Sequence, residues 1–264
     1  MTDTIRKQYQ KQVITLAVQA GKMMMTNGAE VYRVEETIER ICLACGLKEV
    51  EVFATPTGII ASVDSGEDAG GVYTKVKRVR NTRVDLAKVS ELNSFSRIFT
   101  TTEYSPKKGM DKLQEIDSIK PYKLWKRLLG AGIIAAFFCW AIAHNAVDTA
   151  AAGAIGMMSY LFSSWISKYS INYFMNGMIC SAFATFFALL AYSTGLVYHY
   201  DAIIIGSIMI FVPGVAITNS IRDLLYGDMI SGVARMAEAC VVAVAQAAGA
   251  GIILKLWTMG GSLL

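Results

Sequence analysis

The sequence predicts a small α+β domain followed by an all-α membrane bundle of five helices. Two observations carry this prediction. Residues 1–127 hold 21 of the 25 lysines and arginines and 16 of the 21 acidic residues, whereas the rest of the chain is mostly apolar. Within the charged part, the apolar pattern changes from helical spacing to strand-like alternation after residue 48. We therefore expect a cytoplasmic domain over 1–120 and a membrane domain over 121–264.

The charged domain is expected to open with two amphipathic helices. Apolar residues recur at helical spacing from Val13 to Met24, and the sequence TNG then ends the run. A second stripe runs from Val31 to Cys45 and stops at Gly46, which suits the position just after a helix.

Three strands come next in the predicted order. Their alternating patterns cover 48–55, 57–64 and 72–80, and the turn-rich segment 65–71 joins the last two. This pattern predicts an antiparallel meander. A long helix from Asn81 to Thr102 and a short charged segment, 107–120, complete the domain.

The domain carries no recognisable catalytic signature. Cys42 and Cys45 form a C-x-x-C pair, which could be redox-active or bind a metal. Both cysteines continue the apolar stripe of their helix, and no histidine or second pair lies near them, so we favour a structural role. Nucleotide-binding, metalloprotease and serine-hydrolase motifs are absent from the sequence. We expect no enzyme activity, no cofactor, no metal and no nucleic-acid partner.

Five apolar segments have about the 20 residues that a membrane-spanning helix needs. They are 128–145, 147–167, 174–193, 201–219 and 229–256. Lys120, Lys123, Lys126 and Arg127 precede the first, and the positive-inside rule places such a cluster in the cytoplasm. The chain also opens without an apolar signal segment. We expect a multi-pass protein of the plasma membrane, among its lipids, with the N-terminal domain in the cytoplasm and the C-terminus outside.

The fourth apolar segment contains a helix breaker. Pro213 has no N–H, so the carbonyl of Met209 is expected to lose its helical partner, and Gly214 beside it imposes no steric restraint. Broken membrane helices can hold ions or carboxylates on the exposed backbone groups. The alternative is a simple kink that a neighbouring helix or water repairs.

Polar residues follow this break. Asn219, Arg222 and Asp223 share one helical face, and they lie either buried or in a cytoplasmic loop, 219–229, that also contains Asp228. Arg235 and Glu238 are three residues apart, two turns into the last span. Because charges are costly in a membrane, we expect these two to pair and to face the bundle interior, with Arg235 near Pro213. A purely structural pair is the alternative.

Polar candidates in the first domain have a simpler alternative. Any of them could be an ordinary solvated position or part of a local ion pair on a helix surface. They are Gly28, Glu30, Arg33, Arg80, Asn93 and Arg97.

Four segments together resemble the threonine/serine exporter family. They are GAEVYRVEETIERIC (28–42), EVFATPTGIIASV (51–63), KRVRNTRVDLAKVSELN (77–93) and VPGVAITNSIRDLLYGDMISGVAR (212–235). The resemblance implies a cytoplasmic domain ahead of membrane spans. It also implies the shorter, split form of the family, in which a separate small membrane protein supplies the remaining spans. Residues inside the matching segments gain weight as functional candidates, and the chain could also form homo-oligomers.

The leading hypothesis is a secondary-transporter subunit that exports small carboxylate metabolites, of the threonine and serine type, driven by the proton gradient. Arg222 or Arg235 would pair with the substrate carboxylate, while Asp223, Asp228 or Glu238 would bind an amino group or relay a proton. Export of dicarboxylates such as succinate, which the resemblance links to split members, is the alternative substrate class. A membrane-tethered enzyme and a signalling scaffold are the alternatives from other classes.

Overall fold

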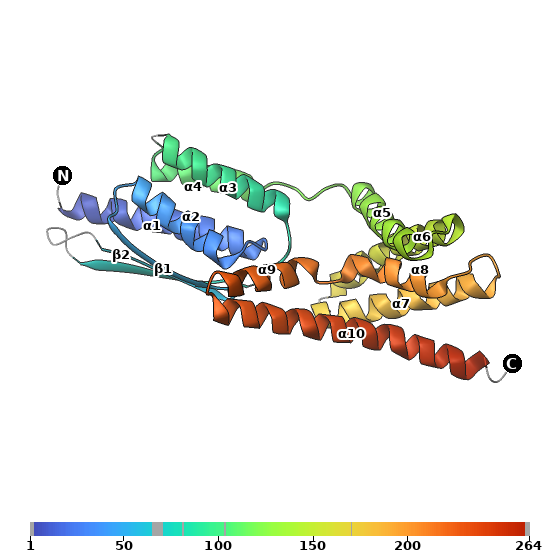
Figure 1. The fold of residues 1–264 in the computed structure, drawn as a ribbon. Helices are drawn as coiled ribbons and strands as arrows, with labels where there is room; N and C mark the ends of the chain where they lie inside the picture. Colours follow the sequence, from blue (N-terminus) through green and yellow to red (C-terminus); the bar gives the residue numbers. More distant parts are fainter. Residues whose placement is uncertain (1–2, 65–70, 81, 103, 170, 262–264) are drawn as a thin grey trace. The chain divides into compact units, whose positions relative to one another are not determined.

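A computed structural model describes residues 3–64, 71–80, 82–102, 104–169 and 171–261 (Figure 1). The chain forms two compact units, and each unit is built from two separate stretches of the sequence. The first unit comprises residues 1–120 together with 215–236, and the second comprises 121–214 together with 237–264. A segment from the apolar half of the sequence therefore folds with the charged half.

A three-stranded antiparallel sheet forms one layer of the first unit, as the alternating patterns predict. Strands β1 (Glu49–Thr55), β2 (Gly58–Asp64) and β3 (Val72–Arg78) lie in the order β1-β2-β3. In the register, Phe53 pairs with Ile60, and Ile60 pairs with Val76. These three side chains are exposed, whereas Ile59 and its neighbours on the other face are buried in the core.

Two layers of helices cover that buried face (Figure 1). Helices α1 (Asp3–Thr26) and α2 (Val31–Ala44) pack on each other and on the sheet, and α3 (Leu86–Thr101) and α4 (Pro106–Asp117) pack on them. The contact between α1 and α2 is close, because a Cβ atom on Gly21 would lie 2.5 Å from the Cδ1 atom of Ile38. One hydrophobic core joins all four helices and the sheet.

Two boundaries differ from the sequence prediction. Helix α3 begins at Leu86 because the side chain of Asp85 accepts the N–H of Lys88 and caps the helix there. Asn81 and residues 65–70 of the predicted turn lie outside the described residues. The segment predicted as a charged linker, 107–120, is largely helix α4, because Pro106 starts it and an apolar stripe, including Leu113, packs into the core.

The second unit is a helical bundle. It contains α5 (Leu124–Ala143), α6 (Ala146–Ile166), α7 (Tyr173–Ser193), α8 (Tyr200–Ile208), the short helices η1 (Ser167–Tyr169) and η2 (Met209–Phe211), and most of α10 (Met229–Gly261). Helix α5 packs against α6 and α8, and α6 packs against α7. Small residues permit these contacts: a Cβ atom on Gly206 would lie 2.5 Å from the carbonyl oxygen of Ala135. Such close approach is typical of helices packed in lipid.

Fewer helices qualify as membrane spans than the five predicted. Within the described residues, α5, α7 and α10 are long and apolar enough, and the bent pair formed by α8–η2 and α9 (Gly214–Leu225) adds a fourth if its two helices make one span. The segment predicted as 147–167 does form a helix, α6, but among the described residues this helix is not one of those that are long and apolar enough to span a membrane.

The predicted span 201–219 is not one continuous helix. Val212 has extended backbone angles, φ −62° and ψ 131°, as a residue before proline prefers, and a new helix begins at Gly214. Residues 219–225, predicted as the start of a loop, instead continue this helix, α9. The helix persists because partners within the first unit hold its polar face.

We predict that Gly249→Ala destabilises the second unit. A Cβ atom there would lie 2.1 Å from the carbonyl oxygen of Met178, and such overpacking costs about 1–3 kcal/mol. Gly251→Ala is the matched control, because a Cβ atom at this position meets nothing within 4 Å. The melting temperature of the purified full-length protein in detergent should fall for the first variant and not for the second. Equal melting temperatures would contradict the α7–α10 contact.

Candidate functional site

The turn between α1 and α2 is the centre of the candidate site. Helix α1 ends in a Schellman motif, in which the N–H of Ala29 bonds to the carbonyl of Met24 and the N–H of Gly28 to that of Met25. Gly28 has φ +91°, which disfavours any residue with a side chain. Glu30 is then the extended N-cap residue of α2. The chain thus reverses within a few residues and leaves backbone groups in need of partners.

Side chains from α9 and α10 supply those partners. Asn219 donates its Nδ2 to the carbonyl of Gly28 (2.8 Å), and Arg235 donates its Nη2 to the carbonyl of Ala29 (2.9 Å). The N–H of Val31 donates to Oδ1 of Asp223 at 3.1 Å. Since the first N–H groups of a helix have no internal partner and attract negative charge, a carboxylate suits this place. We call Asn219, Asp223 and Arg235 the turn-binding triad.

Asp223 and Arg235 also form a buried ion pair. Oδ2 of Asp223 and Nε of Arg235 lie 3.1 Å apart, and the two residues are 0% and 9% exposed. In the described part of the chain neither atom has an aligned hydrogen-bond partner, so charge attraction rather than a directed bond joins them. Arg235 therefore does not pair with Glu238 as predicted. Glu238 is exposed, and the prediction that it faces the interior is wrong for this chain.

A second ion pair lies next to the first and is more open. Oε1 of Glu30 bonds to Nη1 of Arg222, and Oε2 of Glu30 lies 3.3 Å from Nε of Arg33. The Glu30 side chain is 8% exposed, whereas that of Arg222 is 48% exposed. Of the two arginines expected to meet a carboxylate, Arg222 is thus accessible and Arg235 is enclosed.

The end of α9 adds an aromatic contact to the same place. Gly227, with φ +91°, closes a second Schellman motif in which the N–H of Asp228 bonds to the carbonyl of Asp223 at 2.8 Å. Tyr226, just before that glycine, stacks on Tyr32 of α2 with ring centroids 4.1 Å apart. Asp228 is half-buried at the start of α10, and burial raises the pKa of its carboxyl group.

The other two motif segments, 77–93 and 51–63, form hydrogen bonds with the α1–α2 turn and with α2, respectively. The N–H of Arg83 donates to the carbonyl of Thr26 (2.8 Å), and its Nε donates to Oδ1 of Asn27 (3.1 Å). Glu35 on α2 accepts the N–H of Ala54 on β1 at 2.8 Å. All four segments that resemble the family therefore contribute to the structure around the α1–α2 turn or to the helix that follows it.

Glu35 is held in an environment that disfavours its charge. Burial raises the pKa of its carboxyl group most, the N–H of Ala54 lowers it, and the nearby acidic groups of Asp228, Glu39 and Asp223 raise it further. Burial and the neighbouring acidic groups thus both favour the neutral form of the Glu35 carboxyl group.

Three predicted candidates lie away from this site. Arg80 and Arg97 are exposed, and Asn93 is half-buried on α3. The contacts described for Asn93 and Arg97 are made by their backbone carbonyls, which accept hydroxyl groups of Ser96 and Thr100. The structure does not bring these three residues together.

The proline break is repaired within the second unit. The carbonyl of Met209, predicted to be free, accepts the N–H of Val212 at 3.3 Å because the backbone tightens into η2. The carbonyl of Phe211 accepts Nε2 of Gln246 on α10 at 2.6 Å. A local hydrogen bond and a neighbouring helix therefore satisfy these two carbonyls, as the simple-kink alternative expects, but the chain begins a new helix at Gly214 instead of continuing one kinked helix.

Both cysteines of the C-x-x-C pair have free thiols. Burial raises the pKa of the Cys42 thiol to about 12. Burial also raises the pKa of Cys45, although a hydrogen bond to Tyr9 lowers it in part. Because the thiolate is the reactive form, these shifts favour the structural role.

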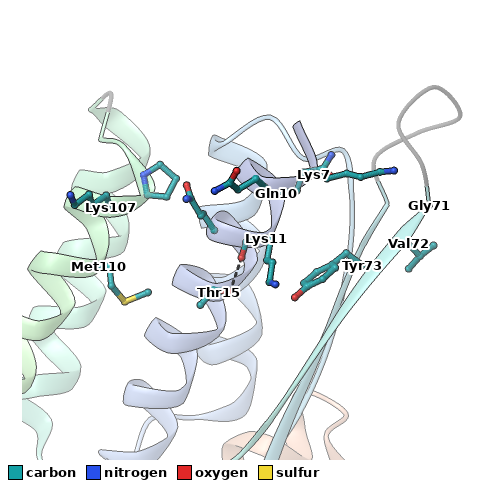
Figure 2. A pocket seen from close by; sticks show the side chains of 12 residues that line it. Lys7, Gln10, Lys11, Thr15, Gly71, Val72, Tyr73, Lys107 and Met110 are labelled. Carbon is teal, nitrogen blue, oxygen red and sulfur yellow. Dashed lines mark hydrogen bonds between the residues drawn. The ribbon is translucent and has the colours of Figure 1, made fainter. Parts of the chain in front are cut away.

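A basic cleft of about 850 Å³ lies along the other half of α1. Figure 2 shows Lys7 and Lys11 of α1, Tyr73 of β3 and Lys107 of α4 around it. None of the described residues that line it is acidic, and none is a predicted site residue. About 15 residues of helix, roughly 22 Å, separate Lys11 from the turn, so the cleft is distinct from the turn-binding triad.

Comparison with known proteins agrees with the motif segments. Residues 15–257 match the family ThrE, described as "Putative threonine/serine exporter". The chain is 24% identical over 266 residues to "Probable succinate transporter subunit YjjP" of Klebsiella aerogenes, covering 97% of this chain and 98% of that protein. The Escherichia coli K12 protein of the same name is also 24% identical, with 97% and 99% covered.

A longer relative matches over part of its length. The chain is 21% identical to "Probable threonine/serine exporter" of Mycobacterium tuberculosis over 254 residues, which cover 95% of this chain and 47% of that protein. No solved structure matches this chain significantly.

We predict that Arg235→Ala loosens the α1–α2 turn. The change leaves Asp223 buried without its counter-charge and Ala29 without a donor, which typically costs about 3–5 kcal/mol. Hydrogen–deuterium exchange of the full-length protein should become faster at the N–H of Val31 and through the first turn of α2. Arg40→Ala, which removes a surface pair with Glu36, is the control and should cost at most about 1 kcal/mol. Unchanged exchange in Arg235→Ala would show that the buried pair does not hold the turn.

Proposed function

Because this chain belongs to the threonine/serine exporter family, we propose that it is one subunit of a secondary transporter for small carboxylate-bearing metabolites. The family consists of exporters, not enzymes. Amino acids of the threonine and serine type are the first substrate class. Dicarboxylates such as succinate are the second, and they are favoured by the names of the two relatives that match over their whole length. The proton gradient is the proposed driving force, since the sequence contains no nucleotide-binding motif.

The observation that carries a site assignment is the unequal exposure of the two arginines. Arg235 is enclosed and neutralised by Asp223, whereas Arg222 presents almost half of its side chain to solvent while it contacts Glu30. A guanidinium group binds carboxylates through two parallel hydrogen bonds. We therefore assign substrate contact to Arg222, with Glu30 as the internal carboxylate that the substrate displaces. Asp228 remains the candidate for the substrate amino group.

A partner subunit follows from the same comparisons. The YjjP relatives are named as subunits, and the chain matches less than half of the longer mycobacterial protein. We propose that a separate small membrane protein supplies the further spans. Self-association of this chain is compatible with that assembly.

The proposed arrangement in the plasma membrane places residues 1–120 in the cytoplasm and the C-terminus outside. In it, α5, α6, α7, α8 with its broken continuation α9, and α10 are the five segments of the membrane domain, 121–264, and α9 folds with residues 1–120 at the cytoplasmic end of the fourth segment. The basic cluster before α5 supports this orientation through the positive-inside rule. The first turns of α10 fold with the cytoplasmic domain, and α10 is long enough for this, since its 33 residues exceed the roughly 20 that a bilayer requires.

Single cysteines in a cysteine-free background test this orientation. We predict that an impermeant thiol reagent labels Leu196→Cys and Thr258→Cys in intact cells, and that it labels Lys107→Cys only after the cells are opened. All three positions are exposed. Labelling of Lys107→Cys in intact cells would show that the orientation is the reverse of the proposed one.

The function itself is tested by efflux. Cells loaded with a threonine-containing dipeptide should release threonine faster when this chain and its small partner are expressed together, and serine and succinate are measured in parallel. Unchanged efflux of all three compounds at confirmed expression would refute the proposal.

We predict that Arg222→Ala abolishes most of this efflux, and that Arg222→Lys restores only part of it, because an ammonium group cannot form the two parallel bonds of a guanidinium. Arg40→Ala removes an arginine of α2 outside the site and is the control. Normal efflux by Arg222→Ala, with wild-type amounts of protein in the membrane, would remove Arg222 from the substrate path.

A further inference from the structure

A second pair of titratable groups lies in the helical bundle and takes no part in the site described above. Asp148, in the first turn of α6, is 0% exposed. Its Oδ2 lies 2.7 Å from Nδ1 of His199, and its Oδ1 accepts the N–H of Tyr198 at 2.8 Å. The sequence prediction missed this pair because about 50 residues separate its members.

The histidine connects the buried carboxylate to the surface. The His199 side chain is 52% exposed, whereas that of Asp148 is fully enclosed. A proton that arrives at the exposed edge of the imidazole therefore reaches a group in direct contact with a buried negative charge. This geometry differs from an ordinary surface ion pair, in which both partners are in water.

Other titratable groups near the pair come from α5, α7 and α8. These groups are Cys139 on α5, Tyr200 and Asp201 on α8, and Tyr192 on α7, whose ring packs on that of Tyr200. Cys139 lies near both Asp148 and Asp201. Within the described residues, His199 is the one cationic partner recorded for Asp148.

The pair can hold one exchangeable proton. With the imidazole neutral, its Nδ1–H donates to Asp148, and the pair carries one negative charge in an enclosed position. Addition of a proton at Nε2 gives an imidazolium–carboxylate pair with no net charge, and its loss restores the first state. An imidazole ring can bind and release a proton at one nitrogen while the other nitrogen keeps its hydrogen bond.

The pair lies at the end of the bundle away from the basic residues. Lys123, Lys126 and Arg127 surround the start of α5, while Asp148 follows its end; a helix of 20 residues spans about 30 Å. Under the proposed topology, the basic end faces the cytoplasm and the pair faces outside. An exporter driven by inward proton flow needs a proton-binding group that opens to the outside.

We propose that Asp148 and His199 form the outward-facing proton-binding site that couples export to the proton gradient. The inference rests on the proposed exporter function. It assigns to the pair a role separate from that of Arg222, since protons enter here and the substrate carboxylate is held elsewhere.

The test separates proton coupling from transport as such. Vesicles that contain the full-length chain and its partner subunit are loaded with the substrate identified by efflux. Net efflux is measured with an acidic exterior, and substrate–substrate exchange is measured at equal pH on both sides. His199→Gln keeps a side-chain N–H donor toward Asp148 but cannot take up a proton, and Asp148→Asn removes the charge. His144→Asn is the matched control, because His144 is the chain's other histidine and is exposed at the same end of the bundle.

We expect His199→Gln and Asp148→Asn to lose the acceleration of net efflux by external acid while they retain exchange, and His144→Asn to behave as the wild type. The inference would be overturned if external acid still accelerated net efflux fully in His199→Gln. It would also be overturned if His144→Asn were the only variant to lose this acceleration. If Asp148→Asn also loses substrate–substrate exchange, the result for His199→Gln decides whether the inference stands. A wild-type complex that transports no substrate in either mode would instead refute the exporter function, and the inference would fall with it.

Discussion

The first unit depends on a turn that cannot satisfy its own backbone. Between α1 and α2 the chain reverses at Gly28, and in the described part of the chain two carbonyls and one N–H find their partners in side chains 191, 192 and 206 residues away. An unsatisfied buried polar group costs about 1–3 kcal/mol. The turn-binding triad therefore explains why a segment from the apolar half of the sequence folds with the charged half.

Two ion pairs in one place have different consequences because their burial differs. The Asp223–Arg235 pair is enclosed, and a buried pair of this kind is costly to break. The Glu30–Arg222 pair shares its carboxylate with Arg33 and remains open on the arginine side. The enclosed pair fixes the ends of α9 and α10, and so it determines where the accessible guanidinium of Arg222 lies.

Local patterns predicted what depends on local spacing. Both N-terminal helices, the three strands and the role of Gly46 follow from periodicity and turn chemistry, and the structure confirms them. The partners of the charged residues could not be predicted in this way. Glu238 is close to Arg235 along the helix, but Asp223 is close to it in space, and one hydrogen bond, from the N–H of the distant Val31, holds Asp223 there. Likewise, the sequence marks Pro213 as a break but cannot show that Gln246 repairs it.

The chain passes between the two units three times, and the three crossings differ mechanically. One lies beside the extended residues that precede α5, and one lies next to the break at Pro213, where the helical axis is interrupted. The third falls between residues 236 and 237, inside α10 and near its start. Because α10 continues through this crossing as one uninterrupted helix, helical hydrogen bonds join the residues on its two sides, whereas extended residues and a proline break lie at the other two crossings.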